Sequence, residues 1–130
     1  IYMDINRRRP VRITPEIMDR YESEPENRVF TEKITKTDIP DTDYIEIAYN
    51  ILRRDVDHLG HMHNISYLDA AYDVMPEEYF NGPQFNFVSI EYRKELLKND
   101  DVKIHFYKID NGCIISLNTD KINSVITLKY

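Results

Sequence analysis

The sequence has little that points to secretion, membranes or nucleic acid. Its single cysteine, Cys113, cannot form an intrachain disulfide, which fits a reducing compartment and predicts a cytoplasmic protein. No apolar run approaches the ~20 residues needed to span a bilayer, and no signal peptide is visible. The net charge of −6 disfavours general nucleic-acid binding, which usually requires a basic surface.

The composition is that of a globular protein with an aromatic core. Of the 130 residues, 42% are hydrophobic and 31% charged, with ten tyrosines and five phenylalanines. These aromatic residues suit a β-rich core or a dimer interface better than a ligand platform. Cys113 follows a glycine at a strand start, which favours a small buried hydrophobe. The chain begins at Ile1 rather than methionine, so we expect a fragment of a larger protein.

Residues 1–42 differ in pattern from the remainder of the chain. Alternation in residues 1–5 indicates the end of a strand, and Pro10 confines any pairing there to an edge. Residues 14–23 predict a short helix with Thr14 as N-cap and Pro15 at the first helical position. Residues 24–42 are charged and contain two prolines, which is typical of a linker.

Residues 43–130 predict one folded domain. Period-2 hydrophobicity from Ile45 to Ile51 indicates a strand. A helical pattern then places Ile65, Leu68, Ala71, Tyr72 and Met75 on one face, and Pro76 ends that helix. Four strands follow, at about 85–96, at 102–106, at 113–117 and at 122–128, with a type I′ turn expected at Asn111–Gly112. The last strand is expected to place Ile122, Ile126 and Leu128 on one face. The fold class is therefore α+β: one antiparallel sheet wrapped around a central helix.

The densest chemistry lies in the segment 55–64, which reads DVDHLGHMHN and precedes the helix. The helix N-terminus that follows this segment would supply backbone N–H donors and a positive dipole potential for a developing oxyanion. The same residues also suit a solvated loop and helix cap. A zinc site would use His58, His61 and His63 with Asp55 or Asp57, but the spacing matches no helix-face or finger pattern, and we expect no metal.

Four segments in the same order resemble a known family. Residues 53–68, RRDVDHLGHMHNISYL, are similar to the D-x-D-x-N-x-H-V-N-N-x-x-Y-[IL] signature of acyl-acyl carrier protein thioesterases. Residues 89–95, SIEYRKE, resemble that family's E-Y-[RK]-[RK]-E strand, and residues 75–79, MPEEY, the end of its helix. Residues 8–13, RRPVRI, resemble the segment that ends the first half of such enzymes.

The resemblance implies a fold and an activity. Members are tandem hotdog domains, so residues 1–42 would be the tail of a preceding hotdog domain plus linker, and 43–130 a hotdog thioesterase domain. The implied reaction releases free fatty acid from fatty acyl-acyl carrier protein in fatty acid biosynthesis, without metal or soluble cofactor. The implied partners are acyl carrier protein, carrying the acyl chain on phosphopantetheine, and either the missing N-terminal hotdog domain or a second copy in a homodimer. Basic residues, among them Arg93 and Lys94, would meet the acidic carrier protein or serve only solubility.

The resemblance also assigns site residues. The motif's second Asp falls on Asp57, its His on His61 and the later Glu on Glu95, which become the predicted catalytic residues. The predicted substrate-binding residues are His63, Asn64 and Tyr67. The family's catalytic Asn falls on Leu59, which has no hydrogen-bonding side chain, and the Cys that often follows the Glu falls on Leu96.

These residues predict a reaction mechanism, and two alternative functions remain open. We expect water to attack an acyl thioester, with Glu95 as general base and Asp57–His61 polarising the site. The alternatives are an acyl-coenzyme A thioesterase and a non-catalytic acyl-binding or assembly domain. Leu59 favours the second alternative. Glu91 and Arg93 are expected on the strand face that bears Glu95, and a solvent-facing charge pattern explains these two as well as a role in the site does. The spacing between Glu95 and His61 favours a role in the site for Glu95.

Overall fold

The chain forms two compact units, Ile1–Thr35 and Lys36–Tyr130. The computed structural model describes residues 3–4, 6–7, 9–22, 24, 26–27 and 35–130. Part of the predicted linker therefore lies outside the described residues. The second unit begins before residue 43, where the domain boundary was predicted.

The first unit contains a small hairpin and one short helix. Strand β1 (Met3–Asp4) pairs antiparallel with β2 (Arg9–Pro10), so Pro10 sits in a two-strand pair as its missing N–H requires. Helix α1 (Pro15–Arg20) starts with Pro15 at its first turn, as predicted. The Thr14 side chain makes no capping bond, and its carbonyl accepts the N–H groups of Ile17 and Met18 instead.

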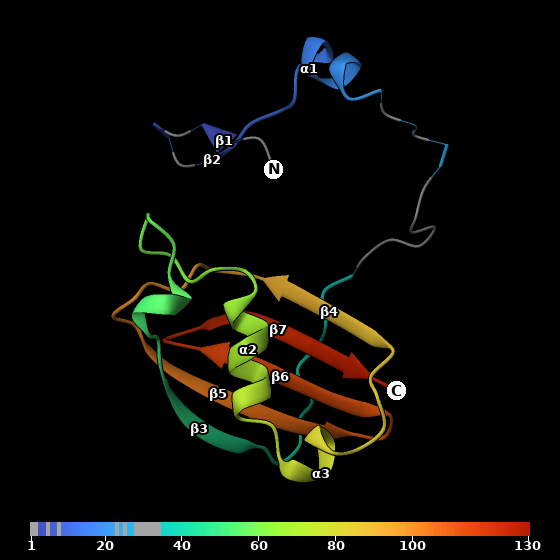
Figure 1. Ribbon diagram of the computed structural model, residues 1–130, viewed down its shortest axis with the longest axis vertical. Coiled ribbons are helices and arrows are strands. Elements are labelled where there is room, and N and C mark those ends of the chain that lie inside the picture. Colours follow the sequence, from blue (N-terminus) through green and yellow to red (C-terminus); the bar gives the residue numbers. More distant parts are fainter. Residues whose placement is uncertain (1–2, 5, 8, 23, 25, 28–34) are drawn as a thin grey trace. The chain divides into compact units, whose positions relative to one another are not determined.

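The second unit is a five-stranded antiparallel sheet in the order β3-β5-β6-β7-β4. Its strands are β3 (Ile45–Asn50), β4 (Phe87–Tyr92), β5 (Asp101–Ile109), β6 (Gly112–Asn118) and β7 (Ile122–Lys129). Three short 3-10 and α-helical elements complete it: η1 (Arg53–Asp55), α2 (Ser66–Asp73) and α3 (Glu77–Phe80). The sheet curls around α2 (Figure 1), which confirms the predicted hotdog architecture.

The core lies between α2 and the concave face of the sheet. Alternate residues of the three central strands face this core: Val102, Ile104, Phe106, Cys113, Ile115, Leu117, Ile126 and Leu128. Helix α2 contributes Tyr67, Ala70 and Ala71, and Met75 follows it. The predicted helix face was partly wrong, because Ile65 is 65% exposed and Tyr72 38% exposed. Pro76 does end the helical run, and α3 begins directly after it.

Two local predictions about the strands were wrong. Strand β4 ends at Tyr92 instead of running to Leu96. Ile122 packs with the outer-face residues Tyr107, Ile114 and Val125, because an irregularity in the ladder at Leu117/Asn118 changes its facing.

The turn after β5 is not type I′. Both central residues of that turn need a positive φ, and Asn111 has none. Gly112 instead enters β6 at φ +146°, where a Cβ would lie 2.0 Å from the Leu128 carbonyl oxygen. Close backbone approach therefore requires glycine there.

Residues 36–44, here called the outer strap, lie across the convex face of the sheet (Figure 1). At β4 the Thr37 N–H donates to the Glu91 carboxylate, and Arg93 Nη2 donates to the Thr37 carbonyl at 2.7 Å. Ile39 packs on the cluster formed by Tyr107, Ile114 and Val125. This explains why strand residues on the outer face are buried as well.

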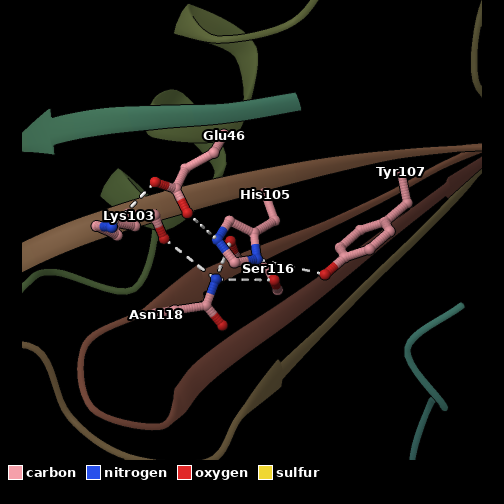
Figure 2. Close-up of polar contacts among 6 residues, drawn as sticks. All are labelled: Glu46, Lys103, His105, Tyr107, Ser116 and Asn118. Atoms are coloured by element: carbon pink, nitrogen blue, oxygen red, sulfur yellow. Dashed lines mark hydrogen bonds and ion pairs between the residues drawn. The ribbon is translucent and has the colours of Figure 1, made fainter. Parts of the chain in front are cut away.

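A polar network occupies the outer face near β3 (Figure 2). Glu46 contacts Lys103 Nζ and His105 Nε2, each at 2.9 Å, and these bonds lower the pKa of Glu46. His105 Nδ1 lies 3.3 Å from the Tyr107 hydroxyl, and Tyr44 of the strap stacks on His105 at 4.2 Å. The network joins the strap to the sheet on the side opposite α2. Among the described residues, no helix is long and apolar enough to cross a membrane.

Candidate functional site

The acid–histidine run forms a tight loop closed by its own backbone. The Asp57 N–H donates to the His61 carbonyl at 2.9 Å, and the Gly60 N–H to the Asp57 carbonyl at 3.1 Å. Val56 and Met62 form an antiparallel bridge that closes the loop below these bonds. Gly60 has φ +80°, a conformation that suits glycine at the tip. The loop is thus a small rigid support for His61.

Asp57 acts on the backbone of this loop. Its Oδ1 accepts the N–H of Leu59 at 2.8 Å and the N–H of His61 at 3.1 Å. Desolvation opposes ionisation, but the His61 and Leu59 N–H groups outweigh it, so the pKa of Asp57 is lowered. Asp57 was expected to polarise the site together with His61, and that role remains a prediction. Asp57 holds the main chain that carries His61.

Glu95 reaches the site because β4 ends early. Residues 93–97 leave the sheet. The prediction that Glu95 shares a strand face with Glu91 was therefore wrong. The departing segment pairs with the loop instead: His61 and Leu97 form a bridge, and the Met62 N–H donates to the Leu96 carbonyl at 2.7 Å. These backbone contacts bring Glu95 next to His61.

The structure brings His61 and Glu95 together. Nε2 of His61 lies 3.5 Å from Oε2 of Glu95. Their side chains are 32% and 59% exposed respectively, so both are open to solvent and to a substrate in the described chain. The arrangement can hold a water molecule between the Glu95 carboxylate, which can act as a base, and the His61 imidazole.

The three predicted substrate-binding residues have different environments. His63 is exposed, and its Nδ1 accepts the Ile65 N–H at 3.4 Å. Asn64 is exposed, and its carbonyl accepts the Tyr92 hydroxyl at 3.0 Å. Tyr67 is only 3% exposed, and its hydroxyl accepts the Leu96 N–H at 3.1 Å. Substrate contact remains a prediction for all three, and the geometry of Tyr67 is that of a support.

Leu59 sits at the tip of the loop and is 66% exposed. Its backbone N–H is bonded to Asp57, while its side chain offers the site no polar atom. The position that would carry an amide in the resembled family therefore faces outward with an aliphatic group.

The remaining acids and histidines of the run do not converge. Asp55 is 6% exposed and accepts the Leu52 N–H at 2.7 Å and the Tyr49 hydroxyl at 3.4 Å. Burial and the Asp55 charge raise the pKa of Tyr49 to about 12. In the described part of the chain, no three His, Cys, Asp or Glu side chains are grouped to hold a metal ion.

Two structural features were not predicted from the sequence motifs. A cavity of about 410 Å³ opens beside α2, and its lining includes Asp55, Asp69 and Asp73. Asn123 is fully buried, and its Nδ2 donates to the Glu95 carbonyl at 3.2 Å. The acidic spacing on α2 was visible in the sequence, whereas nothing local linked Asn123 to Glu95.

The fold is that of a hotdog domain, and it brings His61 beside Glu95. A family model described as the acyl-ACP thioesterase C-terminal domain matches residues 39–129. The chain therefore belongs to the acyl-ACP thioesterase family, and the described second unit corresponds to that family's C-terminal domain.

Individual relatives agree with this assignment. The chain is 27% identical over 112 residues to oleoyl-acyl carrier protein thioesterase 2, chloroplastic, of Arabidopsis thaliana, covering 78% of this chain and 30% of that protein. A putative oleoyl thioesterase from Lactobacillus plantarum superposes with a TM-score of 0.76 at 22% identity. A 12:0-ACP thioesterase from Umbellularia californica gives 0.73 at 14% identity. Both structures cover 98% of this chain, which spans 52% of each of them, and both show the shared fold.

Proposed function

We propose that the protein containing this chain hydrolyses fatty acyl-acyl carrier protein thioesters and releases free fatty acid in fatty acid biosynthesis. The observation that carries the proposal is the 3.5 Å contact between His61 Nε2 and Glu95 Oε2 in a chain of the acyl-ACP thioesterase family. The two residues come from separate motifs, and only the early end of β4 brings them together.

The proposed chemistry is attack by water on the thioester carbon. Glu95 takes a proton from water as the new carbon–oxygen bond forms, and general base catalysis of this kind contributes about 10²–10⁴-fold. The carbon–sulfur bond then breaks, and the departing phosphopantetheine sulfur takes up the proton. His61 lies beside the base and polarises the reacting groups, while Asp57 keeps the His61 backbone in place. Water and a carboxylate suffice for this step, so the proposal includes no metal or soluble cofactor.

The proposed partners follow from exposed groups on the domain. Ile65, Tyr72 and Leu59 are large apolar side chains exposed on α2 and its preceding loop. We place a second hotdog domain over such groups, either the N-terminal twin or another copy. Arg93 is bonded to Thr37 and Glu91, so it is a strap anchor and a poor candidate for contacting the carrier protein. The cytoplasmic location remains a prediction.

Substrate preference tests the proposal. We expect the whole protein to hydrolyse acyl-acyl carrier protein at least about tenfold more efficiently than coenzyme A carrying the same acyl chain, measured as kcat/KM. A tenfold preference is only about 1.4 kcal/mol, which a few carrier-protein contacts supply. Equal or better hydrolysis of the coenzyme A thioester would instead assign an acyl-coenzyme A thioesterase.

A binding domain without turnover is a second candidate, and Leu59 favours it. Because Leu59 is exposed on this domain, Leu59→Asn adds an amide at the loop tip with little effect on packing within the domain. If the wild type binds acyl-acyl carrier protein without hydrolysing it, and Leu59→Asn restores measurable hydrolysis, the chain is a decayed enzyme. Wild-type turnover that Leu59→Asn changes only a few-fold supports the hydrolase.

A further inference from the structure

Glu95 lies on an irregular segment, so its position is not fixed by a sheet ladder. The last paired residue of β4 is Tyr92, opposite Ser124. The next two N–H groups, those of Arg93 and Lys94, both donate to the carbonyl of Asn123 at 2.8 and 3.0 Å. Two donors on one acceptor end the regular pairing, and the chain turns away from the sheet just before Glu95.

The Asn123 side chain holds the carbonyl end of the Glu95–Leu96 peptide bond. Asn123 Nδ2 donates to the Glu95 carbonyl at 3.2 Å. The same amide is fixed at its oxygen, because Oδ1 accepts both the N–H and the hydroxyl of Thr119 at 2.9 Å. A fully buried amide with both ends occupied is a rigid support.

The N–H side of the same peptide bond is held by helix α2. The Leu96 N–H donates to the Tyr67 hydroxyl at 3.1 Å, and Leu96 is fully buried. The Tyr67 ring packs edge-on against Tyr92 with centroids 5.2 Å apart, and Tyr67 itself is 3% exposed. The ring therefore has little freedom, and its hydroxyl stays aimed at the Leu96 N–H.

We infer that Tyr67 and Asn123 are positioning residues that fix the Glu95 carboxylate against His61 by holding the Glu95–Leu96 peptide from both sides. The inference rests on the proposed function, in which Glu95 is the base. Neither side chain needs to touch substrate, since each acts through the backbone of Glu95. A base displaced by as little as 1 Å can lose about 10²-fold in rate, so such a support belongs to the catalytic arrangement.

Tyr67→Phe and Asn123→Asp test the inference in the whole protein. Tyr67→Phe removes only the hydroxyl, and Asn123→Asp keeps the acceptor for Thr119 but replaces the donor to Glu95. The matched controls are Tyr107→Phe, a buried tyrosine bonded to His105 on the outer face, and Asn118→Asp, whose amide donates to Lys103 and Ser116. Rates are referred to the folded fraction measured by circular dichroism.

We expect both test variants to lower kcat for acyl-acyl carrier protein by at least about tenfold with KM within about threefold, and both controls to stay within about twofold. In a Glu95→Gln background, Tyr67→Phe should lower the residual rate by less than about twofold, because it acts through Glu95.

Three results separate the possible failures. If Glu95→Gln alone retains normal kcat, the base role fails and the inference fails with it. If Glu95→Gln loses turnover while Tyr67→Phe and Asn123→Asp stay within twofold of wild type, only the positioning inference is overturned. An equal loss from Tyr67→Phe with and without Glu95 also overturns it.

Discussion

At the scale of single residues, several acids of the second unit bond to backbone groups. Asp57 accepts two loop N–H groups, Asp55 accepts the Leu52 N–H, and Glu91 accepts the Thr37 N–H. Buried or half-buried backbone groups need such partners wherever helices and strands do not supply them. The acids around the site thus set the path of the chain, and Glu95 remains the exposed acid beside His61.

Asp57 gives a prediction that separates support of the loop from charge. Asp57→Asn keeps an oxygen that accepts the Leu59 and His61 N–H groups, whereas Asp57→Ala removes it. We expect kcat of Asp57→Asn to fall by less than about fivefold and that of Asp57→Ala by more than about tenfold. Equal, large losses in both variants would show that the Asp57 charge acts on the reaction itself.

The lowered pKa of Asp57 predicts a change of stability with pH. A carboxyl whose pKa is lowered by folding stabilises the native state above its unfolded pKa, near about 3.9, and loses that contribution as pH falls through the folded value. Wild type should therefore lose more stability than Asp57→Asn between about pH 4 and pH 2, as measured by urea unfolding. Parallel losses in the two proteins would contradict the assignment.

Cys113 illustrates a residue whose position was predicted correctly. It is fully buried, and burial raises the pKa of its thiol to about 12. We expect iodoacetamide at pH 8 to label the native protein slowly and the urea-unfolded protein at least about tenfold faster. Equally fast labelling of the native protein would show that the thiol is reachable.

At the scale of elements, the early end of β4 positions the site, and the outer strap stabilises the second unit. The ladder of β4 stops at Tyr92 and releases the segment that carries Glu95. The outer strap covers the convex face and buries residues that a sheet with one solvated face would expose.

The strap makes a stabilising contribution that a single substitution measures. Ile39→Ala removes apolar contacts with Tyr107, Ile114 and Val125, and we expect a loss of about 1–2 kcal/mol in the free energy of unfolding. Ile65→Ala is the matched control, because Ile65 is 65% exposed, and should change stability by less than about 0.5 kcal/mol. Equal effects from both would mean that the strap does not pack stably on the sheet.

Two glycines with positive φ should differ in their tolerance of alanine. At Gly60 (φ +80°) an added Cβ meets nothing within 4 Å, so only backbone strain of about 1–2 kcal/mol applies. At Gly112 the Cβ would lie 2.0 Å from Leu128 O, so the β6–β7 pairing must shift. We expect Gly112→Ala to cost at least about 2 kcal/mol more than Gly60→Ala in thermal or urea unfolding. Equal costs would refute the close approach.

Strand and helix periodicity predicted the fold. The features that periodicity did not predict depend on contacts between residues distant in sequence. The strands from Val102 and Cys113 follow the predicted alternation because alternate residues of each pack in the core around α2, whereas Ile45 at the start of β3 is 52% exposed. The end of β4 at Tyr92 depends on Asn123, and the facing of Ile122 depends on a ladder irregularity. Both are tertiary effects without a local signal. His61 and Glu95 were predicted through family motifs, while the supports Tyr67 and Asn123 became visible only in three dimensions.

At the scale of the whole molecule, the second unit is a hotdog domain with a solvent-open His–Glu pair. The chain spans 52% of the solved thioesterases that it superposes on, so the activity of the whole protein is the subject of the proposal. Ile65, just before α2, and Tyr72 on α2 are exposed apolar groups, and the second hotdog domain that we propose would pack over them.

The most direct measurement compares two His–Glu pairs of the same chain. Glu95→Gln removes the proposed base, while Glu46→Gln alters a pair on the outer face, where Glu46 lies 2.9 Å from His105. The account predicts that kcat of the whole protein for an acyl-acyl carrier protein thioester falls by about 10²–10⁴-fold in Glu95→Gln and stays within about twofold in Glu46→Gln. Turnover of folded Glu95→Gln within a few-fold of wild type would contradict it.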